Sequence, residues 1–419
     1  MSSVVIAGDV SGSVTLQAPS VAGSTTLTLP ATSGTVLTTA STTGISGSAI
    51  TSGTVAEAYG GTGTSTGYYG FKNRLINGAM MIDQRNAGAV FTPTSGVQYG
   101  LDRWANYVTQ ASKFTLQQSS TVPAGFSTSL KLTSSSAYSV TSTDTFVFFQ
   151  SIEGYNIADL AWGTASASAV TLSFKVYSSL TGTFSGSIKN NAGDRVYPFS
   201  YSVPVANTWT TISLTIPGDT TGTWLTNNGA GLTVVYNVGS GANFLGTGGA
   251  WGSANVNGVT GSVSVVGTNG ATFYITGVQL EKGSNATSFD YRPYGTELAL
   301  CQRYYEKSFD DGTAPANGAN STSLATGNGS SATVAGNNSL FGGPIRFAVQ
   351  KRTAATITAY GNNSGYWAYV STSASSTVNW SANTVLFANQ GAGGFSVLQN
   401  VTNNVYYSIF GHWTASAEL

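Results

Sequence analysis

The chain has 419 residues with 16 basic and 16 acidic side chains, and its formal net charge at pH 7 is +0. Only 8% of the residues are charged, against roughly 25% in an average soluble protein. The chain lacks the basic stripe that binds nucleic acid and any apolar run of the roughly 18 residues that a membrane span needs. One cysteine, Cys301, excludes an internal disulfide and a thiolate metal site. We therefore expect no nucleic acid, no membrane insertion, no metal and no cofactor.

Residues 1–70 repeat a short β-rich unit every eleven residues, starting at Gly12, Gly23 and Gly34. The β-rich runs are Val14–Leu16, Thr25–Leu29 and Val36–Thr38. Ordering one residue costs about 1–2 kcal/mol of backbone entropy, and this segment has few large apolar side chains to offset that cost. Such repeats need neighbours. We expect either a homotrimer whose copies form an attachment and shaft segment, or a disordered Gly/Ser/Thr tail.

Residues 71–295 are rich in aromatic side chains and alternate with a period of two residues. The run Val170–Ser178 places Val170, Leu172, Phe174 and Val176 on one face. Further strands are predicted at Trp209–Gly218, Leu232–Val238 and Gly261–Gly267. Strands of this kind, separated by turns about every ten residues, are typical of a β-sandwich. We predict an all-β domain here, a jelly roll.

The last predicted strand of this domain, Thr272–Glu281, changes phase at Gly277. Phe273 and Ile275 share one parity along the strand, whereas Val278 and Leu280 share the other. A β-bulge at the glycine would return all four side chains to the same side. We therefore predict a bulge at Gly277 and a core position for each of the four apolar residues.

Residues 296–308 are predicted to form a short linking helix, followed by a second β domain at 309–419. Thr296 is the expected N-cap, and Cys301 is expected to be a small buried hydrophobe rather than a nucleophile. The second domain is predicted to be a β-sandwich and the receptor-binding tip. Its candidate strands are Ser339–Gln350, Ala354–Gly361, Tyr366–Thr372, Thr384–Gln390 and Val405–Ala415.

The few charged residues are concentrated in two segments, with six of them within 72–103 and eight within 281–307. We interpret the segments as junctions at the two ends of the central domain, where ion pairs fix how the pieces meet. Two ordinary surface loops are the alternative. Arg292 can hold a carboxylate in a bidentate pair, with Asp290 or the Asp102–Arg103 pair as candidate partners. We expect Asp102, Arg103, Glu281, Asp290 and Arg292 to be structural rather than catalytic.

Much of the chain resembles the tail-fibre and minor-tail proteins of tailed bacteriophages. The matching stretches are Asn73–Gly88, Tyr99–Trp104, Gln150–Ala165, Ala206–Trp224, Thr272–Ser308 and the ending "GHWTASAEL". The N-terminal "GSTTLTLPATSGTV" and "GGTG" are similar to fibre attachment and shaft segments. The chain departs from the pattern at Ala79, where the family often has a polar or acidic residue, and at Lys175, where an aromatic is common.

The resemblance implies a homotrimeric fibre of the virion, assembled in the host cytoplasm. Its N-terminus would dock onto other tail or adaptor proteins. Its jelly-roll domains, like carbohydrate-binding domains, would recognise polysaccharide on the bacterial surface. The segment that closes the jelly roll in that family resembles the part of this chain that contains Glu281, Asp290 and Arg292.

The sequence gives little indication of catalysis. Glycoside hydrolysis usually needs two carboxylates about 5–10 Å apart, and no acidic pair has a spacing specific to that role. His412 is the single histidine, and its neighbours Gly411 and Trp413 favour a packed or interface position over a general base. One histidine and one cysteine are too few for a zinc site. We predict that the protein is not an enzyme.

Binding of uncharged sugars suits this composition better, since the chain has 8 Trp and 21 Tyr. Aromatic rings cover the apolar face of a sugar and amides bond its hydroxyls. The aromatic residues beside Gly or Asn are the expected binding residues, with Trp367 the first choice; they are Trp224, Trp251, Tyr366, Trp367 and Trp380. Two alternatives stay open: a tailspike that degrades polysaccharide, and a purely structural head or tail fibre.

Overall fold

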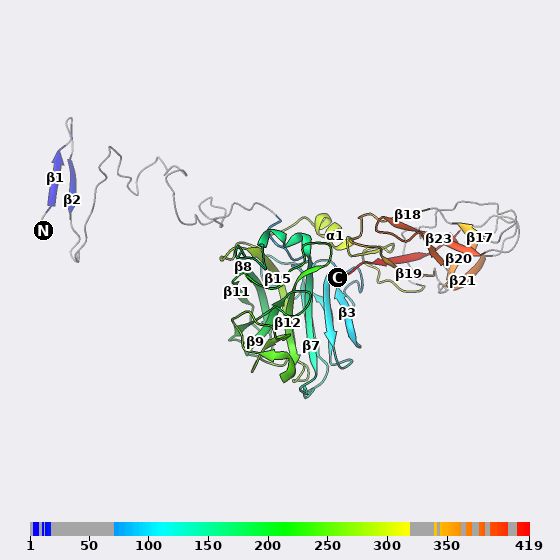
Figure 1. Ribbon diagram of the computed structural model, residues 1–419, viewed down its shortest axis with the longest axis horizontal. Coiled ribbons are helices and arrows are strands. Elements are labelled where there is room, and N and C mark those ends of the chain that lie inside the picture. The colour runs from blue at the N-terminus through cyan, green and yellow to red at the C-terminus, as the bar shows by residue number, and fades with distance from the viewer. Residues whose placement is uncertain are drawn as a thin grey trace. The chain divides into compact units, whose positions relative to one another are not determined.

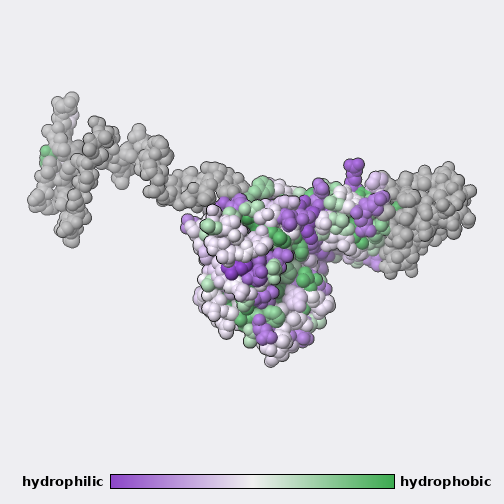
Figure 2. All heavy atoms as spheres, in the orientation of Figure 1, coloured by the Kyte–Doolittle hydropathy of each residue, from purple (hydrophilic) through white to green (hydrophobic). Residues whose placement is uncertain are grey.

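The computed structural model describes residues 3–7, 11, 13–17, 71–318, 339–341, 344–361, 366–370, 377–381, 386–400 and 409–419. The chain divides into two compact units, Met1–Thr54 and Val55–Leu419. Among the described residues, no helix is long and apolar enough to cross a membrane. The surface of the described part is mostly pale on the hydropathy scale, with strongly hydrophilic residues gathered in patches (Figure 2). The pale colour is that of residues near the middle of the scale, such as serine, threonine and glycine.

The described part of the first unit is a β-hairpin. Its strands, β1 (Ser3–Ala7) and β2 (Ser13–Gln17), pair in antiparallel register. The predicted run Val14–Leu16 lies within β2. The runs predicted at 25–29 and 36–38 lie outside the described residues, so the eleven-residue repeat and the homotrimer stay predictions, as do the domain boundaries at 70, 295 and 308.

Two antiparallel sheets form a β-sandwich in the second unit (Figure 1). The six-stranded sheet has the order β10-β9-β12-β7-β4-β3 and the five-stranded sheet the order β11-β8-β15-β6-β5. The strands of the first sheet are β3 (Gly96–Leu101), β4 (Trp104–Val108), β7 (Thr145–Glu153), β9 (Gly182–Lys189), β10 (Val196–Val203) and β12 (Ala230–Ser240). Those of the second are β5 (Phe114–Ser119), β6 (Ser129–Ser134), β8 (Val170–Ser178), β11 (Thr210–Ile216) and β15 (Thr272–Lys282).

The pairing of these strands is that of a jelly roll. Strand β9 pairs with β10, β8 with β11, β7 with β12 and β6 with β15. The first strand of the set, β6, thus pairs with the last, β15. Each following pair lies between the strands of the previous pair in the sequence, down to the hairpin of β9 and β10. Such a ribbon, folded over so that its successive pairs alternate between two sheets, defines the jelly roll, and this prediction is confirmed.

The core lies between the two sheets and follows the predicted alternation. Val170, Leu172, Phe174 and Val176 of β8 are all buried. Aromatic rings from the opposite sheet meet them, and the ring of Tyr236 lies edge-on to Phe174 with centroids 5.3 Å apart. Each large apolar side chain buried in this way contributes about 1.5–3 kcal/mol relative to an exposed position.

A β-bulge interrupts β15 where the sequence predicts it. The register against β8 shifts between Thr276 and Gln279, and Gly277 has a φ of 63°, a left-handed value that costs glycine little. The bulge turns Val278 to the same side as Ile275, and both are fully buried. The prediction of a bulge that keeps the apolar residues in the core is confirmed.

The strand predicted at Gly261–Gly267 is wrong, because the segment is a loop. Val265 and Val266 are buried in the core, and their N–H groups both donate to the carbonyl oxygen of Val238, at 2.8 and 3.2 Å. The burial of these two valines and their hydrogen bonds therefore hold the segment in place, although it does not form a β-strand. The remaining short elements of the sandwich are η3 (Gly154–Asn156), η4 (Ala158–Leu160), η5 (Ala242–Phe244), β13 (Leu245–Gly246) and β14 (Gly258–Val259).

The linking helix is shorter than predicted and begins earlier. Helix α1 spans Tyr294–Gln302, its N-cap is Pro293, and no side chain caps it, so the expected cap at Thr296 is wrong. The end of the predicted helix forms strand β16 (Tyr305–Lys307) instead, because pairing with another strand overrides local helix propensity. Cys301 is fully buried, as expected of a small hydrophobe, and burial raises the pKa of its thiol well above the usual value.

The described part of residues 309–419 consists of antiparallel strands; their arrangement as a second β-sandwich stays a prediction. The strands are β17 (Ser339–Phe341), β18 (Ile345–Arg346), β19 (Thr356–Tyr360), β20 (Tyr366–Val370), β21 (Thr377–Ser381), β22 (Leu386–Ala388), β23 (Gly394–Asn400), β24 (Ile409–Phe410) and β25 (His412–Ser416). Strands β21 and β23 were not among the predicted ones. The ring of His412 stacks on Phe309 with centroids 4.2 Å apart, which fits the expected packed histidine.

Candidate functional site

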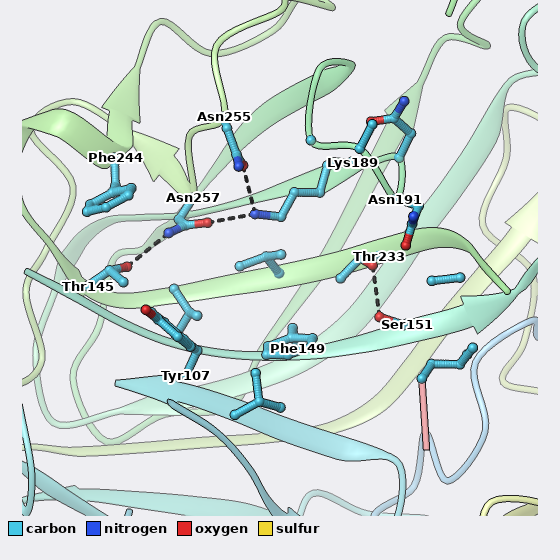
Figure 3. Close-up of a pocket in the computed structure, with 18 residues that line it drawn as sticks. Tyr107, Thr145, Phe149, Ser151, Lys189, Asn191, Thr233, Phe244, Asn255 and Asn257 are labelled. Atoms are coloured by element: carbon cyan, nitrogen blue, oxygen red, sulfur yellow. Dashed lines mark hydrogen bonds between the residues drawn. The ribbon is translucent and has the colours of Figure 1, made fainter. Parts of the chain in front are cut away.

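A groove lies on the outer face of the six-stranded sheet, across β4, β7, β9 and β12 (Figure 3). Its volume is about 490 Å³. Side chains alternate along β7, so that Phe146 and Phe148 are in the core whereas Val147 and Phe149 line the groove. The strand that crosses the middle of the sandwich therefore carries apolar side chains on both faces.

The floor of the groove is apolar although it faces away from the core. Val147 and Val235 are only 4% and 2% exposed, so the surrounding side chains shield them from water. On the outer face of an antiparallel sheet, polar residues are the usual pattern. A recessed apolar floor with a few fixed polar groups is instead characteristic of ligand-binding sites.

Three aromatic rings contribute to the groove. Tyr107 of β4 is 39% exposed and lies opposite Val147 in the strand register. Phe149 of β7 lies beside it on the floor, and Phe244 of η5 lies near Asn257 (Figure 3). Such rings offer flat apolar faces that can cover one face of a sugar ring.

Polar groups on one side of the groove are held in fixed orientations. Lys189 Nζ donates to Asn255 Oδ1 at 3.1 Å and to Asn257 Oδ1 at 2.9 Å. Asn257 Nδ2 donates in turn to Thr145 Oγ1 at 2.9 Å. Burial lowers the pKa of Lys189 to about 8, so the ammonium remains mostly charged at pH 7. These contacts keep the lysine and the two amides in place without a ligand.

The groove offers binding groups rather than a hydrolytic pair. The described residues that line it supply aromatic, aliphatic, hydroxyl, amide and ammonium side chains, and none of these lining side chains is an Asp or a Glu. In the described part of the chain, no cluster of three or more His, Cys, Asp or Glu could hold a metal ion. Contact with a ring face combined with hydrogen bonds to hydroxyls is the chemistry that this set provides.

Two of the predicted binding aromatics, Trp224 and Trp251, lie outside the groove in a cluster with Trp162. The ring centroids of Trp162 lie 4.6 Å from Trp224 and 5.3 Å from Trp251, both edge-on. Trp224 is 7% exposed, so its predicted role as a surface platform is wrong: edge-to-face packing places the ring inside. Trp251 is half-buried, and its indole N–H donates to the carbonyl oxygen of Pro217 at 2.8 Å.

The other three predicted binding residues lie on a β-hairpin in the C-terminal part. Tyr366 and Trp367 belong to β20 and Trp380 to β21, and the backbone register pairs Trp367 with Trp380. Their side chains lie outside the described structure. Their role in binding therefore stays a prediction.

Three of the predicted structural residues, Glu281, Asp290 and Arg292, lie where the chain leaves β15. Arg292 contacts two carboxylates: Glu297 Oε2 is 3.3 Å from Nη1 and Asp290 Oδ2 is 3.7 Å from Nε. Glu281 accepts hydrogen bonds from the main-chain N–H and the hydroxyl of Thr287, at 2.8 and 2.6 Å. These carboxylates all have partners within the fold.

The other two predicted structural residues, Asp102 and Arg103, lie in the turn between β3 and β4. Both oxygens of Asp102 accept hydrogen bonds at 2.6 Å from Gln84, one from the main-chain N–H and one from Nε2. Burial raises the pKa of Asp102 to about 7. Arg103 is ion-paired with Glu418, and its guanidinium carbon lies 3.6 Å from the ring centroid of Tyr304. The turn is thus linked to residues that follow α1.

The groove residues were missed by the sequence analysis. Tyr107, Phe149 and Lys189 come from separate strands, and only the register of the sheet brings them together. One local signal exists: in "TFVFFQSIE" (Thr145–Glu153), apolar residues occupy both parities. A strand buried on one face alone would alternate with polar residues, so this run indicated a second covered or ligand-binding face.

Comparisons with known proteins find partial likeness in solved structures. No protein-family model and no curated protein matches the chain. The enzymatically active domain of tailspike protein 4 of bacteriophage CBA120 is 17% identical with a TM-score of 0.28, and the match covers 50% of this chain and 21% of that one. A family 11 carbohydrate-binding module from Clostridium thermocellum, in complex with a β-1,3-1,4-mixed-linked tetrasaccharide, is 14% identical with a TM-score of 0.24.

That module is matched over 98% of its length and 47% of this chain. A CBM61 module in complex with β-1,4-galactotriose is 10% identical with a TM-score of 0.26, over 50% of this chain and 98% of the module. The sugars named belong to those proteins. At TM-scores this low, the function of the present chain is inferred from its own groove.

Proposed function

We propose that the jelly roll is a glycan-binding domain whose site is the groove on the six-stranded sheet. The observation that supports this most strongly is the recessed apolar floor, with Tyr107 and Phe149 beside the fixed amides of Asn255 and Asn257. Rings of this kind cover the apolar face of a sugar, and amide groups both donate to and accept from its hydroxyls. Groove volume and chemistry match a site for one or a few sugar residues.

We further propose that the chain is a fibre or receptor-binding protein of a tailed-phage virion. The support is the resemblance of stretches such as Asn73–Gly88 and Tyr99–Trp104, with an N-terminal segment poor in large apolar residues. In this proposal residues 1–70 attach to tail or adaptor proteins, the chain is a homotrimer, and the jelly roll binds host polysaccharide. Sedimentation equilibrium of the full chain tests the assembly: three times the chain mass is expected, and a stable monomer contradicts it.

Several copies of the groove would make weak binding sufficient. A site with a Kd near 1 mM corresponds to about −4 kcal/mol. Linked sites on one particle can raise the apparent affinity by roughly 10²–10⁴. The proposed site therefore does not need to be deep or to enclose its ligand.

We propose binding without hydrolysis, supported by the lack of Asp and Glu side chains among the described lining residues. Purified protein would be incubated with polysaccharides that it binds, and released reducing ends would be measured. No increase over buffer is expected. A steady release that follows the amount of protein would contradict this proposal and leave the binding site intact.

Tyr107→Ala tests the groove as the binding site. Removing the exposed ring takes away an apolar contact with the sugar, and we expect the affinity to fall about tenfold, or roughly 1.4 kcal/mol. The measurement is isothermal titration with whichever glycan the wild type binds on an array of bacterial surface polysaccharides.

The matched control for this variant is Tyr155→Ala. Tyr155 is 63% exposed and lies outside the groove, so its replacement should leave the affinity unchanged. If both variants bind as the wild type does, the glycan occupies another surface, and the groove is not the site.

A further inference from the structure

One lysine in the groove is without an acidic side chain beside it in the described part of the chain. Among the described lining residues, Lys189 is the only one with a charged side chain. Its ammonium contacts the neutral oxygens of Asn255 and Asn257 and forms no ion pair with a described residue. Asp194, on the turn after β9, instead accepts a hydrogen bond from Asn190 at 2.7 Å. Among the described side chains that line the groove, the charge of Lys189 is therefore not matched by a negative one.

Lys189 is partly buried, yet its ammonium contacts neutral amide oxygens, whereas two other shielded cations of the described structure contact a carboxylate. Lys351 is buried, and its Nζ lies 2.5 Å from Glu306 Oε2; Arg303 is partly buried, and its Nη2 lies 2.6 Å from Glu153 Oε1. A buried charge without a counter-ion is unfavourable for folding. Desolvation lowers the pKa of Lys189 accordingly. A residue that opposes stability in the free protein and lies in a groove is a candidate binding residue.

The ammonium also has one donor left for a ligand. Of its three N–H groups, two are used by Asn255 Oδ1 and Asn257 Oδ1. Asn257 keeps its amide oxygen toward the lysine, because the opposite orientation would point two N–H donors at the ammonium, which cannot accept a hydrogen bond. The two amides therefore hold Lys189 Nζ in place on one side of the groove, above the aromatic floor (Figure 3).

We propose that the groove binds an acidic glycan and that Lys189 supplies the countercharge for an anionic group on one sugar residue. This inference rests on the proposed glycan-binding function and specifies its ligand. The third N–H of Lys189 donates to the anion, while Tyr107 and Phe149 contact the ring of the same or the next sugar. A charge-assisted bond of this kind is stronger than one between neutral groups, so the anion determines selectivity.

Matched sugar pairs test the proposal. The probes are oligosaccharides that contain glucuronate, galacturonate or N-acetylneuraminate, each compared with its methyl ester, together with sugar phosphates compared with their neutral parents. The ester keeps the ring and linkage and removes only the charge. We expect the wild type to bind at least one acid about tenfold or more tightly than its neutral partner at low salt, and added salt to reduce this preference. The carboxylate and phosphate arms identify which anion is bound.

Two variants at Lys189 show whether this residue is responsible. Lys189→Met should bring the ratio of acid to ester affinity close to one, whatever loss of affinity both sugars share when Asn255 and Asn257 lose their contact with the ammonium, whereas Lys189→Arg should keep part of the preference. The melting temperature of Lys189→Met should equal or exceed that of the wild type, because the change removes a partly buried charge that forms no ion pair with a described residue. Lys175→Met is the matched control, since Lys175 is a partly buried lysine on β8, in the other sheet, whose ammonium also donates to a neutral oxygen, Oγ1 of Thr211.

The outcomes separate this inference from the proposed function. Equal binding of acid and ester in the groove, or a preference that survives in Lys189→Met, overturns the acidic ligand and leaves glycan binding standing. Binding of neutral sugars alone does the same. No binding of any sugar, charged or neutral, overturns both.

Discussion

Arg103→Met is expected to lower the free energy of unfolding by about 3–5 kcal/mol, the usual effect of breaking a buried ion pair from one side. Arg103 is 2% exposed, pairs with Glu418, stacks on Tyr304, and donates to the carbonyl oxygen of Ser151 at 2.6 Å. Methionine fills similar space but leaves the carboxylate of Glu418 facing a less positive environment. Arg103 has a φ of 67°, and methionine would adopt the same backbone conformation. The change in the free energy of unfolding therefore measures the loss of the side-chain contacts.

Urea denaturation followed by tryptophan fluorescence measures this effect, with Lys282→Met as the control. Lys282 Nζ lies 3.6 Å from Asp159 Oδ2, and the two side chains are 26% and 38% exposed. A surface pair of this kind contributes at most about 1 kcal/mol. If Arg103→Met loses no more stability than Lys282→Met, the contacts between the turn and the residues after α1 do not stabilise the fold as the structure indicates.

Gly78→Ala is expected to lower the free energy of unfolding by about 3 kcal/mol, at the upper end of the usual range for overpacking. A Cβ at this position would overlap the carbonyl oxygen of Val278. That peptide cannot move aside easily, because Val278 N donates to Gly78 O at 2.9 Å and Asn73 Nδ2 donates to Val278 O at 2.9 Å. The β-bulge of β15 is therefore in direct backbone contact with the segment that leads into the sandwich.

Gly295→Ala is the control for this substitution. Gly295 lies in α1, and a Cβ there would meet no atom within 4 Å. Alanine favours a helix over glycine by about 0.5–1 kcal/mol, so this variant should match or exceed the stability of the wild type. Equal stability of Gly78→Ala and Gly295→Ala would show that the contact with Val278 is looser than the structure describes.

The sequence predicted those parts of the fold in which a single strand buries every second side chain along its length. Each core-facing position of β8 is apolar, from Val170 to Val176, because the sheet buries one face along its whole length. The bulge was predictable for the same reason, since the change of phase at Gly277 has to be absorbed locally.

The parts that the sequence did not predict depend on contacts between distant segments. Strand β23 buries only Phe395 and Val397 at alternate positions in its described part, too short a pattern to stand out. Residues 305–307 continue a helical pattern but pair with β25. The groove was missed because Lys189 and Asn257 belong to different segments, and only the folded sheet reveals that the lysine donates to the amide oxygen of Asn257.

The burial of Cys301 has a practical consequence for labelling. It is the single cysteine of the chain, and its side chain is inaccessible with a pKa raised well above its usual value, so the folded protein should scarcely react with maleimide reagents, which need the thiolate. A cysteine introduced at the edge of the groove would then be the preferred position for a fluorescent dye. The native thiol would react only as the fold opens, and thus report unfolding in the same molecule.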